Sequence, residues 1–227
     1  MNVLLTMPLF WAALTIGFFL LGQRLYAALG NSAFAPPILT GLILVVLTLH
    51  LTGTSFDQYM EGGQYLHLML GPVVVMLAVP LYQFIHAIRK DALRIFLAVS
   101  LGSGVTVGVA VALTIWWVGD HAVVASVATK SVTTAVAVVL SEQMGGISAL
   151  ASVCVMITGF AGVVVIPPLL RAAKLDQPKA MGLTMGVCAH AIGTSYALEM
   201  GEEQAAYSAM AMTLTATLHA ILLPWMI

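Results

Sequence analysis

Long apolar runs, separated by short polar stretches, fill nearly the whole chain. Most runs approach the roughly 20 residues that a helix needs to cross a bilayer. The pattern therefore predicts an all-α polytopic membrane protein with about seven spans and one further broken segment. The expected spans are Leu4–Gly22, Pro36–Leu51, Tyr65–Ala87, Leu93–Val118, Ile147–Leu170, Ala180–Met200 and Ala205–Ile227.

Composition agrees with this class. The 227 residues are 61% hydrophobic and 7% charged, whereas a soluble domain carries about 25% charged residues. The net charge of −1 gives no sign of a nucleic-acid partner, and no basic cluster suggests one. Cys154 and Cys188 lie in apolar runs, where core thiols are expected rather than a disulfide or a metal site. We expect one transmembrane domain over residues 1–227, with halves at 1–118 and 119–227, and no metal or cofactor.

Glycine and proline residues mark special positions in three of the runs. In the third run, Gly71-Pro72 and Pro80 interrupt the helix, because proline removes a backbone donor and bends or breaks a helix; two packing kinks are the alternative. Gly104 and Gly108 have the small-residue spacing that lets a neighbouring helix approach. The Ala180–Met200 run, the seventh segment when the lysine stretch is counted as the fifth, has the same kind of stripe at Gly182, Gly186, Ala189 and Gly193.

The residues 126–141, SVATKSVTTAVAVVLS, place a lysine between apolar runs. A lysine at membrane depth costs about 2.5–3.5 kcal/mol on insertion scales, so Lys130 needs a partner, a water-filled cavity or a ligand. If this segment is helical, Thr133 and Thr134 share a face with Lys130, and Ser131 is adjacent. An ammonium with hydroxyls suits a small anion. The alternatives are a lysine that snorkels to the interface or neutralises a buried carboxylate.

Loop charges predict the orientation. Loops with Lys and Arg should face the cytoplasm, and those without should face outward. The stretch around Lys130 must then enter and leave on one side, or break into two half-helices, which membranes tolerate only where backbone lines water or is buried in protein. The inward loops are at 24, 89–94 and 171–179; the outward loops are at 53–64, 119–121 and 201–204.

The same orientation predicts an inverted repeat. Spans two to four and spans six to eight, counting the lysine segment as the fifth, run in opposite senses, and the interrupted third segment matches the interrupted seventh. Paired broken segments indicate a transporter site near the midplane. We expect two discontinuous helices to meet there.

The seventh run supplies the second half of the expected site. His190 and Thr194 are one helical turn apart, and Ser195 is adjacent. Gly193 could break the helix and free backbone amides, which attract carboxylates at a helix N-terminus. His190 is the candidate to donate to the anion or to carry a coupling proton; a packing role is the alternative. His50, His67, His86 and His219 have no ligand-like neighbours in sequence and stay unassigned.

Several motifs resemble the LrgB/CidB family of bacterial inner-membrane proteins, in the right order over about residues 30–225. The matching stretches are PPILTGLILV (36–45), LTGTSFDQYMEGGQYL (51–66), LGPVVVMLAVPLYQ (70–83), KSVTTAVAVVLSEQMGGI (130–147) and AHAIGTSYALEMGEEQAAYSAMAM (189–212). Two positions depart from the family pattern. Ala135 stands where many members have proline, and Tyr196 stands where many have a basic residue, which removes one candidate carboxylate partner.

The resemblance implies a multi-pass protein of the bacterial inner membrane that works with a small holin-like partner of the LrgA/CidA type. Some family members are described as modulators of murein hydrolase export and autolysis. Others carry small monocarboxylates such as pyruvate, glycolate or glycerate. We expect a non-enzymatic carrier for the pyruvate, glycolate and lactate class, forming a homodimer in the bilayer. The alternatives are a regulator of lysis that moves no solute, and an intramembrane enzyme using Ser131 or Ser195 with Lys130.

Overall fold

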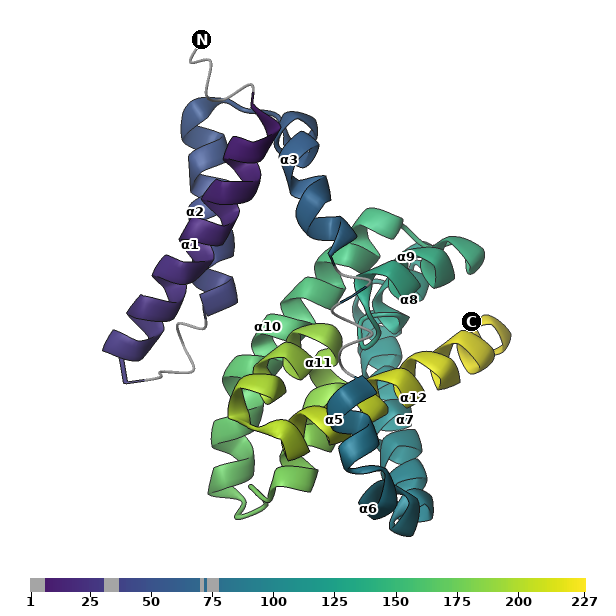
Figure 1. The fold of residues 1–227 in the computed structure, drawn as a ribbon. Coiled ribbons are helices and arrows are strands. Elements are labelled where there is room, and N and C mark those ends of the chain that lie inside the picture. Colours follow the sequence, from purple (N-terminus) through teal and green to yellow (C-terminus); the bar gives the residue numbers. More distant parts are fainter. Residues whose placement is uncertain (1–6, 31–36, 70–71, 73–77) are drawn as a thin grey trace. The chain divides into compact units, whose positions relative to one another are not determined.

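A computed structural model describes residues 7–30, 37–69, 72 and 78–227 (Figure 1). The regular structure of these residues is helical, without strands. The chain forms two compact units, Met1–Met76 and Leu77–Ile227, and each is described by itself. The first unit contains α1 (Pro8–Ala28), α2 (Pro37–Thr52) and α3 (Phe56–Leu68).

The first unit packs around Trp11, which is 1% exposed. The Trp11 ring meets the Tyr59 ring edge-on at 5.9 Å, and the Tyr59 hydroxyl lies 3.1 Å from Thr15 Oγ1. Gly62 allows α3 to approach the backbone of Pro8, where a Cβ would collide. The prediction of a polar loop over 53–64 is therefore wrong for much of that stretch, because aromatic contacts hold it as a helix against α1.

The second unit contains three long helices and five shorter or broken ones. Its long helices are α7 (Ala92–Trp117), α10 (Ser148–Ala172) and α12 (Glu202–Met226). The others are α5 (Ala78–Gln83), α6 (Ile85–Lys90), α8 (His121–Ala128), α9 (Thr134–Gln143) and α11 (Pro178–Met200).

Four described helices are long and apolar enough to cross a membrane: α1, α7, α10 and α12. The shorter α2 is also apolar. The third predicted run forms no continuous helix in the described residues; α3 ends at Leu68, Gly71 lies outside the description, and Pro80 lies within α5. The predicted span Ile147–Leu170 corresponds to α10, which continues through Pro167 and Pro168 to Ala172. Each proline removes one donor near the helix end without blocking the last turn.

The segment around Lys130 forms a helical hairpin from α8 and α9. Ser126 Oγ of α8 accepts a 2.7 Å hydrogen bond from the Ile147 N–H beyond α9, and a Cβ on Gly145 would lie 4.0 Å from His121 Cε1. Both ends of the hairpin therefore lie where α7 stops and α10 starts. The Asp120 side chain caps α8 by accepting from Val123 N at 3.0 Å. We call this α8–α9 segment hairpin 1.

Helix α11 is broken at His190, whose φ of 43° and ψ of −130° are not helical. The second half of α11 folds back onto the first. A Cβ on Gly193 would lie 2.6 Å from Ala189 Cβ, and Ala197 shares a buried cluster with Met185. The sequence analysis expected a break at Gly193; the structure has it three residues earlier, and Gly193 provides the space for the close return. We call α11 hairpin 2.

Hairpin 2 brings the start of α12 back beside the start of α11. A Cβ on Gly182 would lie 2.5 Å from Gln204 O, and Gly186 makes a still closer backbone contact with Ser208. The Lys179 ammonium lies 5.6 Å from the centre of the Tyr207 ring. The predicted small-residue stripe is confirmed as a packing surface. The predicted placement of residues 171–179 and 201–204 on opposite sides is wrong, because the chain reverses at His190.

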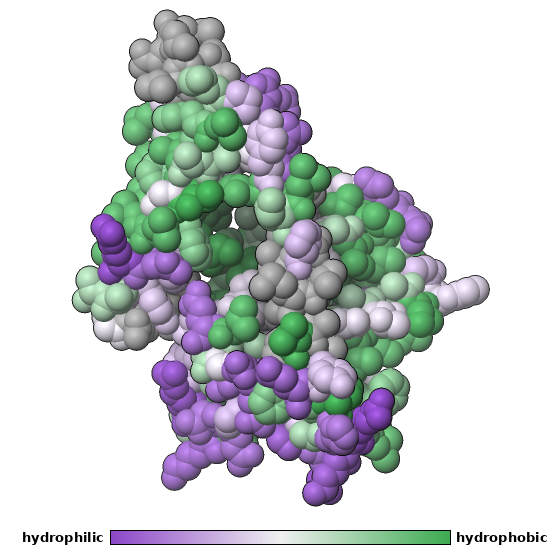
Figure 2. All heavy atoms as spheres, in the orientation of Figure 1, coloured by the Kyte–Doolittle hydropathy of each residue, from purple (hydrophilic) through white to green (hydrophobic). Residues whose placement is uncertain are grey.

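The same end of the second unit carries an ion pair between Asp91 and Lys179, with a 3.0 Å separation. The Lys179 hydrogen bond, more than the nearby charge of Arg94, lowers the pKa of Asp91. Figure 2 shows hydrophilic side chains gathered at this end, where α6 ends and α10 meets α11, with hydrophobic surface along the flanks. The distribution matches a protein that spans a bilayer.

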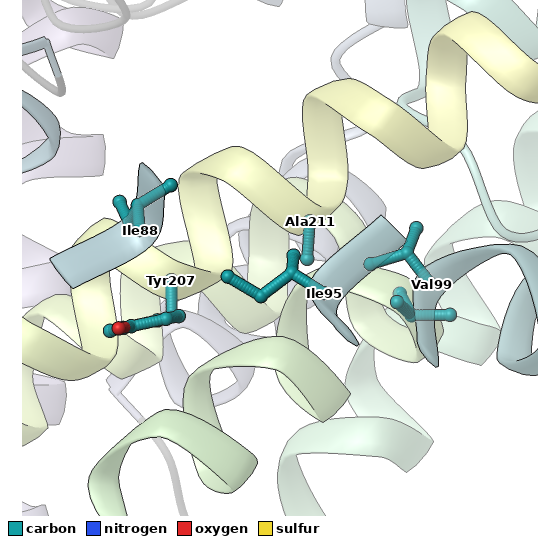
Figure 3. Packing of buried hydrophobic residues seen from close by; sticks show 6 residues of the cluster. Ile88, Ile95, Val99, Tyr207 and Ala211 are labelled. Carbon is teal, nitrogen blue, oxygen red and sulfur yellow. The ribbon is translucent and has the colours of Figure 1, made fainter. Parts of the chain in front are cut away.

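The core beside this ion pair joins α6, α7, α11 and α12 (Figure 3). Its buried members are Ile88, Ile95, Val99, Val187, Tyr207 and Ala211. The expectation that Gly104 and Gly108 admit a neighbouring helix is wrong within the second unit. No atom lies within 4 Å of a Cβ built on either glycine in the described part of the chain, and both line a cavity of about 380 Å³ between α7 and α12.

Candidate functional site between the two hairpins

Lys130 lies in the non-helical tip between α8 and α9, and its ammonium is 3.4 Å from Ser131 Oγ. The side chain is half-buried, and it lines a cavity of about 630 Å³ that follows α7 from Val105 to Val118. No acidic side chain of the described residues lies within 4 Å of the Lys130 ammonium. The structure therefore does not pair this lysine with a buried carboxylate, and its charge is left for another partner.

The hydroxyl side chains of hairpin 1 are not arranged as the sequence predicted. Because residues 129–133 are not helical, Thr133 and Thr134 do not follow Lys130 on one helical face. Thr133 is instead the N-cap of α9, and its side chain makes no capping hydrogen bond. Thr134 opens α9, so the free amides at the start of this helix lie near the lysine tip in sequence. Ser131 is buried, whereas Thr134 is exposed.

His190 occupies the tip of hairpin 2 and is 2% exposed. Its Nε2–H donates a 2.9 Å hydrogen bond to the Val155 carbonyl of α10, while Nδ1 has no partner among the described residues. A positive φ is uncommon for any residue except glycine, and such strain gathers at functional sites. Gly159 makes room for the ring, because a Cβ there would lie 2.9 Å from His190 Cε1.

The other two residues of hairpin 2 that the sequence predicted for the site, Thr194 and Ser195, contact hairpin 2 itself and α12. Thr194 Oγ1 donates to the His190 carbonyl at 2.8 Å and lies 2.9 Å from Ser208 Oγ of α12. Ser195 is exposed and donates to its own helix, at the Ala191 carbonyl. The structure therefore gives Thr194 a role in joining hairpin 2 to α12, and it shows no contact between Ser195 and the lysine tip.

Val155 links the two tips. Its carbonyl accepts from His190, and its side chain shares a buried cluster with Val132, two residues after Lys130. The structure thus brings Lys130, Ser131 and His190 to one region, where two breaks in the helical backbone lie on either side of α10.

A row of buried polar residues on α12 was missed by the sequence analysis. Ser208, Thr215 and His219 are all buried, and their spacing places them along one side of the helix. Ser208 contacts Thr194 of hairpin 2, and His219 contacts Ser103 of α7. Thr215 Oγ1 and His219 Nδ1 have no hydrogen-bond partner in the described part of the chain. The helical spacing of these polar residues in an apolar run was the available signal.

The chemistry of the region suits an anion more than a metal. It offers one unpaired ammonium, an imidazole, hydroxyls and the start of α9, while no group of three His, Cys, Asp or Glu side chains that could hold a metal ion occurs among the described residues. Discontinuous helices at such a site are typical of membrane transporters. The fold defines a multi-pass membrane protein with two broken helical segments in one unit.

The chain belongs to the LrgB-like family, whose family model matches residues 15–227. It is 36% identical to the uncharacterized protein YxaC of Bacillus subtilis (strain 168), over 90% of this chain and 89% of the relative. It is 32% identical to the holin-like protein CidB of Staphylococcus aureus (strain N315), over 94% and 93% of the two chains. It is 33% identical to the holin-like protein CidB of Staphylococcus epidermidis (strain ATCC 12228), over 87% and 86%. No solved structure matches the chain.

Proposed function

We infer that the protein is a carrier for small monocarboxylates of the pyruvate, glycolate and lactate class. The supporting observation is the meeting of two hairpin tips beside an unpaired Lys130. A carboxylate would bind the Lys130 ammonium and Ser131, with the amides that open α9 and the His190 tip completing the site. Thr133 and Thr134 would contribute from α9, while Thr194 and Ser195 would shape hairpin 2.

In this proposal both hairpins are re-entrant. Hairpin 1 enters from the end where α7 stops, and hairpin 2 enters from the end that carries Asp91 and Lys179. Irregular backbone at membrane depth requires burial in protein or contact with water, and a substrate site meets that need. The cavity along α7 would give the anion a route to Lys130, and movement of the hairpins would expose the site to each side in turn.

The energetics are sufficient for a carrier. Affinities between millimolar and micromolar correspond to about 4–8 kcal/mol. One hydrogen bond to a charged group contributes about 1.5–3 kcal/mol, and each neutral one about 0.5–1.5 kcal/mol. A few contacts around Lys130 would therefore suffice, without the tight binding that slows release.

The test is uptake of labelled pyruvate, glycolate and lactate into proteoliposomes. Lys130→Met keeps the length of the side chain but removes the charge. We expect this variant to bind pyruvate about 10- to 150-fold more weakly, the range that corresponds to one charged hydrogen bond, and its uptake at low pyruvate concentration to fall accordingly. Lys130→Arg keeps the charge and should retain part of the activity. Lys90→Met removes an exposed lysine of α6 and should leave uptake unchanged. Uptake that survives Lys130→Met would contradict the proposed site.

A second function is favoured by the names of the relatives, two of which are called holin-like. In that proposal the chain acts with a small LrgA/CidA-type membrane protein, regulates murein hydrolase export and autolysis, and carries no solute. We propose this partner, and a homodimer, for the carrier as well. Flux that is absent both with and without the partner would favour the regulator over the carrier.

A further inference from the structure

The cavity that Lys130 lines is a groove between α7 and α8. On α7 its lining residues recur every fourth position, which places them along one side of that helix. On α8 two lining residues lie one turn apart. The apolar side chains that repeat in this way are Val105, Val109, Leu113 and Trp117 from α7, with Val123 and Val127 from α8. We call this cavity the α7–α8 groove.

The groove combines one charge with apolar walls. Lys130 is the charged residue that lines it within the described part of the chain. Two threonines of α7 also line it, but their hydroxyls bond their own helix. Thr106 Oγ1 donates to the Gly102 carbonyl at 2.7 Å, and Thr114 Oγ1 donates to the Ala110 carbonyl at 2.8 Å. The described residues therefore give the groove a positive charge at the tip of hairpin 1 and apolar surface elsewhere.

The groove is larger than pyruvate requires. Its volume of about 630 Å³ lies in the range of about 300–1,000 Å³ that is usual for pockets that bury drug-sized ligands. The α8 wall has eight residues, or a length of about 12 Å. Pyruvate and lactate end in a single methyl group and glycolate has none. With the carboxylate at Lys130, these anions would leave most of the groove unfilled.

The position of the charge indicates which molecule fits the groove. Lys130 follows the end of α8, whereas α8 starts just after Trp116 and Trp117, where α7 ends. Both tryptophans are exposed, and tryptophan is enriched at membrane interfaces. The ammonium therefore lies at the inner end of the groove, and the apolar walls run from it towards the interface.

A membrane lipid has the opposite arrangement, because its charged headgroup stays at the interface and its chains lie at depth. A soluble monocarboxylate with an apolar tail has the matching one. Its single negative charge would bind the Lys130 ammonium through a charge-assisted hydrogen bond, and its tail would lie along the walls of the groove and displace water from them.

We propose that the α7–α8 groove binds the apolar tail of the transported anion, so that the substrates of the carrier extend to straight-chain monocarboxylates from butyrate to hexanoate. The inference rests on the proposed carrier function, because Lys130 holds the carboxylate in both. Lys130 and Ser131 fix the charged end, and the groove selects the length of the tail. Binding changes no covalent bond.

The experiment measures competition with labelled pyruvate on the purified full-length chain in detergent. Acetate, propionate, butyrate, pentanoate and hexanoate are titrated at neutral pH, where all of them carry the same charge. We expect each added methylene group to strengthen binding about two- to fourfold, the upper value corresponding to complete burial of that group. Hexan-1-ol has the same tail without the charge, and it should displace pyruvate far more weakly than hexanoate does.

A matched pair of variants tests the groove itself. Ala110 lines the groove, whereas Ala112 of the same helix is exposed and does not line it in the described structure. Ala110→Leu fills part of the groove, so it should weaken hexanoate binding more than pyruvate binding and reduce the gain for each methylene group. Ala112→Leu places the same side chain on another side of α7 and should keep the wild-type gain.

An affinity that stays equal or falls as the acids lengthen overturns the inference; this result needs no variant, and pyruvate binding would leave the carrier function standing. Displacement by hexan-1-ol as strong as that by hexanoate also overturns it, because the tail would then bind without the charge of Lys130. So does an equal gain for each methylene group in Ala110→Leu and Ala112→Leu. If wild type binds neither pyruvate nor hexanoate, the proposed function fails and this inference fails with it.

Discussion

Replacing Gly159 of α10 by alanine is expected to destabilise the tip of hairpin 2. A Cβ at this position would lie 2.7 Å from Ile192 Cδ1 and 2.9 Å from His190 Cε1. The end of the Ile192 side chain can rotate away. The His190 ring cannot move as easily, because its Nε2–H is bonded to the Val155 carbonyl at 2.9 Å.

The magnitude follows from three effects. Overpacking a filled site costs about 1–3 kcal/mol, and weakening the His190 hydrogen bond costs about 0.5–1.5 kcal/mol. Alanine returns about 1 kcal/mol, because it favours the helix over glycine. The net expectation is a loss of about 2 kcal/mol, which lowers the unfolding midpoint by about 4–8 °C in a chain of this size.

The assay is thermal unfolding in detergent, followed with a thiol-reactive fluorescent dye. Cys154 and Cys188 are free and partly buried, one on α10 and one just before the hairpin 2 tip, so they report opening of this region. Gly104→Ala is the matched control. A Cβ on Gly104 meets no described atom within 4 Å, and this variant should unfold at the wild-type temperature or slightly above it.

A double-mutant cycle sharpens the test. If the clash with the ring is responsible, Gly159→Ala should cost less in a His190→Ala background, because the ring is then absent. A Gly159→Ala midpoint equal to or above that of Gly104→Ala would refute the packing of hairpin 2 against α10. Equal costs of Gly159→Ala in both backgrounds would instead assign the strain to Ile192.

The remaining predictions concern two polar contacts. Thr194→Val removes the 2.9 Å contact with Ser208 and leaves that buried hydroxyl unpaired, so we expect the free energy of unfolding to fall by about 1–3 kcal/mol and the thermal unfolding midpoint to fall with it. The control Thr217→Val, at an exposed residue that bonds its own helix, should change the midpoint little. Equal effects of the two variants would contradict a role for Thr194 in joining hairpin 2 to α12. For Asp91, the bond to Lys179 lowers the pKa of the folded carboxyl below its usual 3.8, so its stabilising effect is present above that pH and disappears as pH falls through the folded value. The midpoint difference between wild type and Asp91→Asn should therefore be largest near neutral pH and vanish in acid; a difference that grows in acid would be inconsistent with the ion pair.

The sequence by itself determined the class of the protein and the polar residues at its centre. In a bilayer, the backbone N–H and C=O groups of a spanning segment must hydrogen-bond within the protein. For apolar runs of the length found in this chain, that requirement predicts helices. The cost of a lysine in such a setting singled out Lys130, and the small residues of the seventh run marked a close packing surface. These inferences depend on composition and spacing, which the sequence contains directly.

Only the tertiary structure decided where the chain reverses. Residues 180–200 have the length of a span, and a single backbone conformation at His190 turns them into a hairpin. That reversal places residues 201–207 beside Lys179, and no loop charge reveals it. His219 shows the same limit, because its partner Ser103 is 116 residues away and only packing of α7 against α12 brings the two together. Long-range contacts of this kind depend on side-chain fit across helices, which periodicity along one helix does not encode.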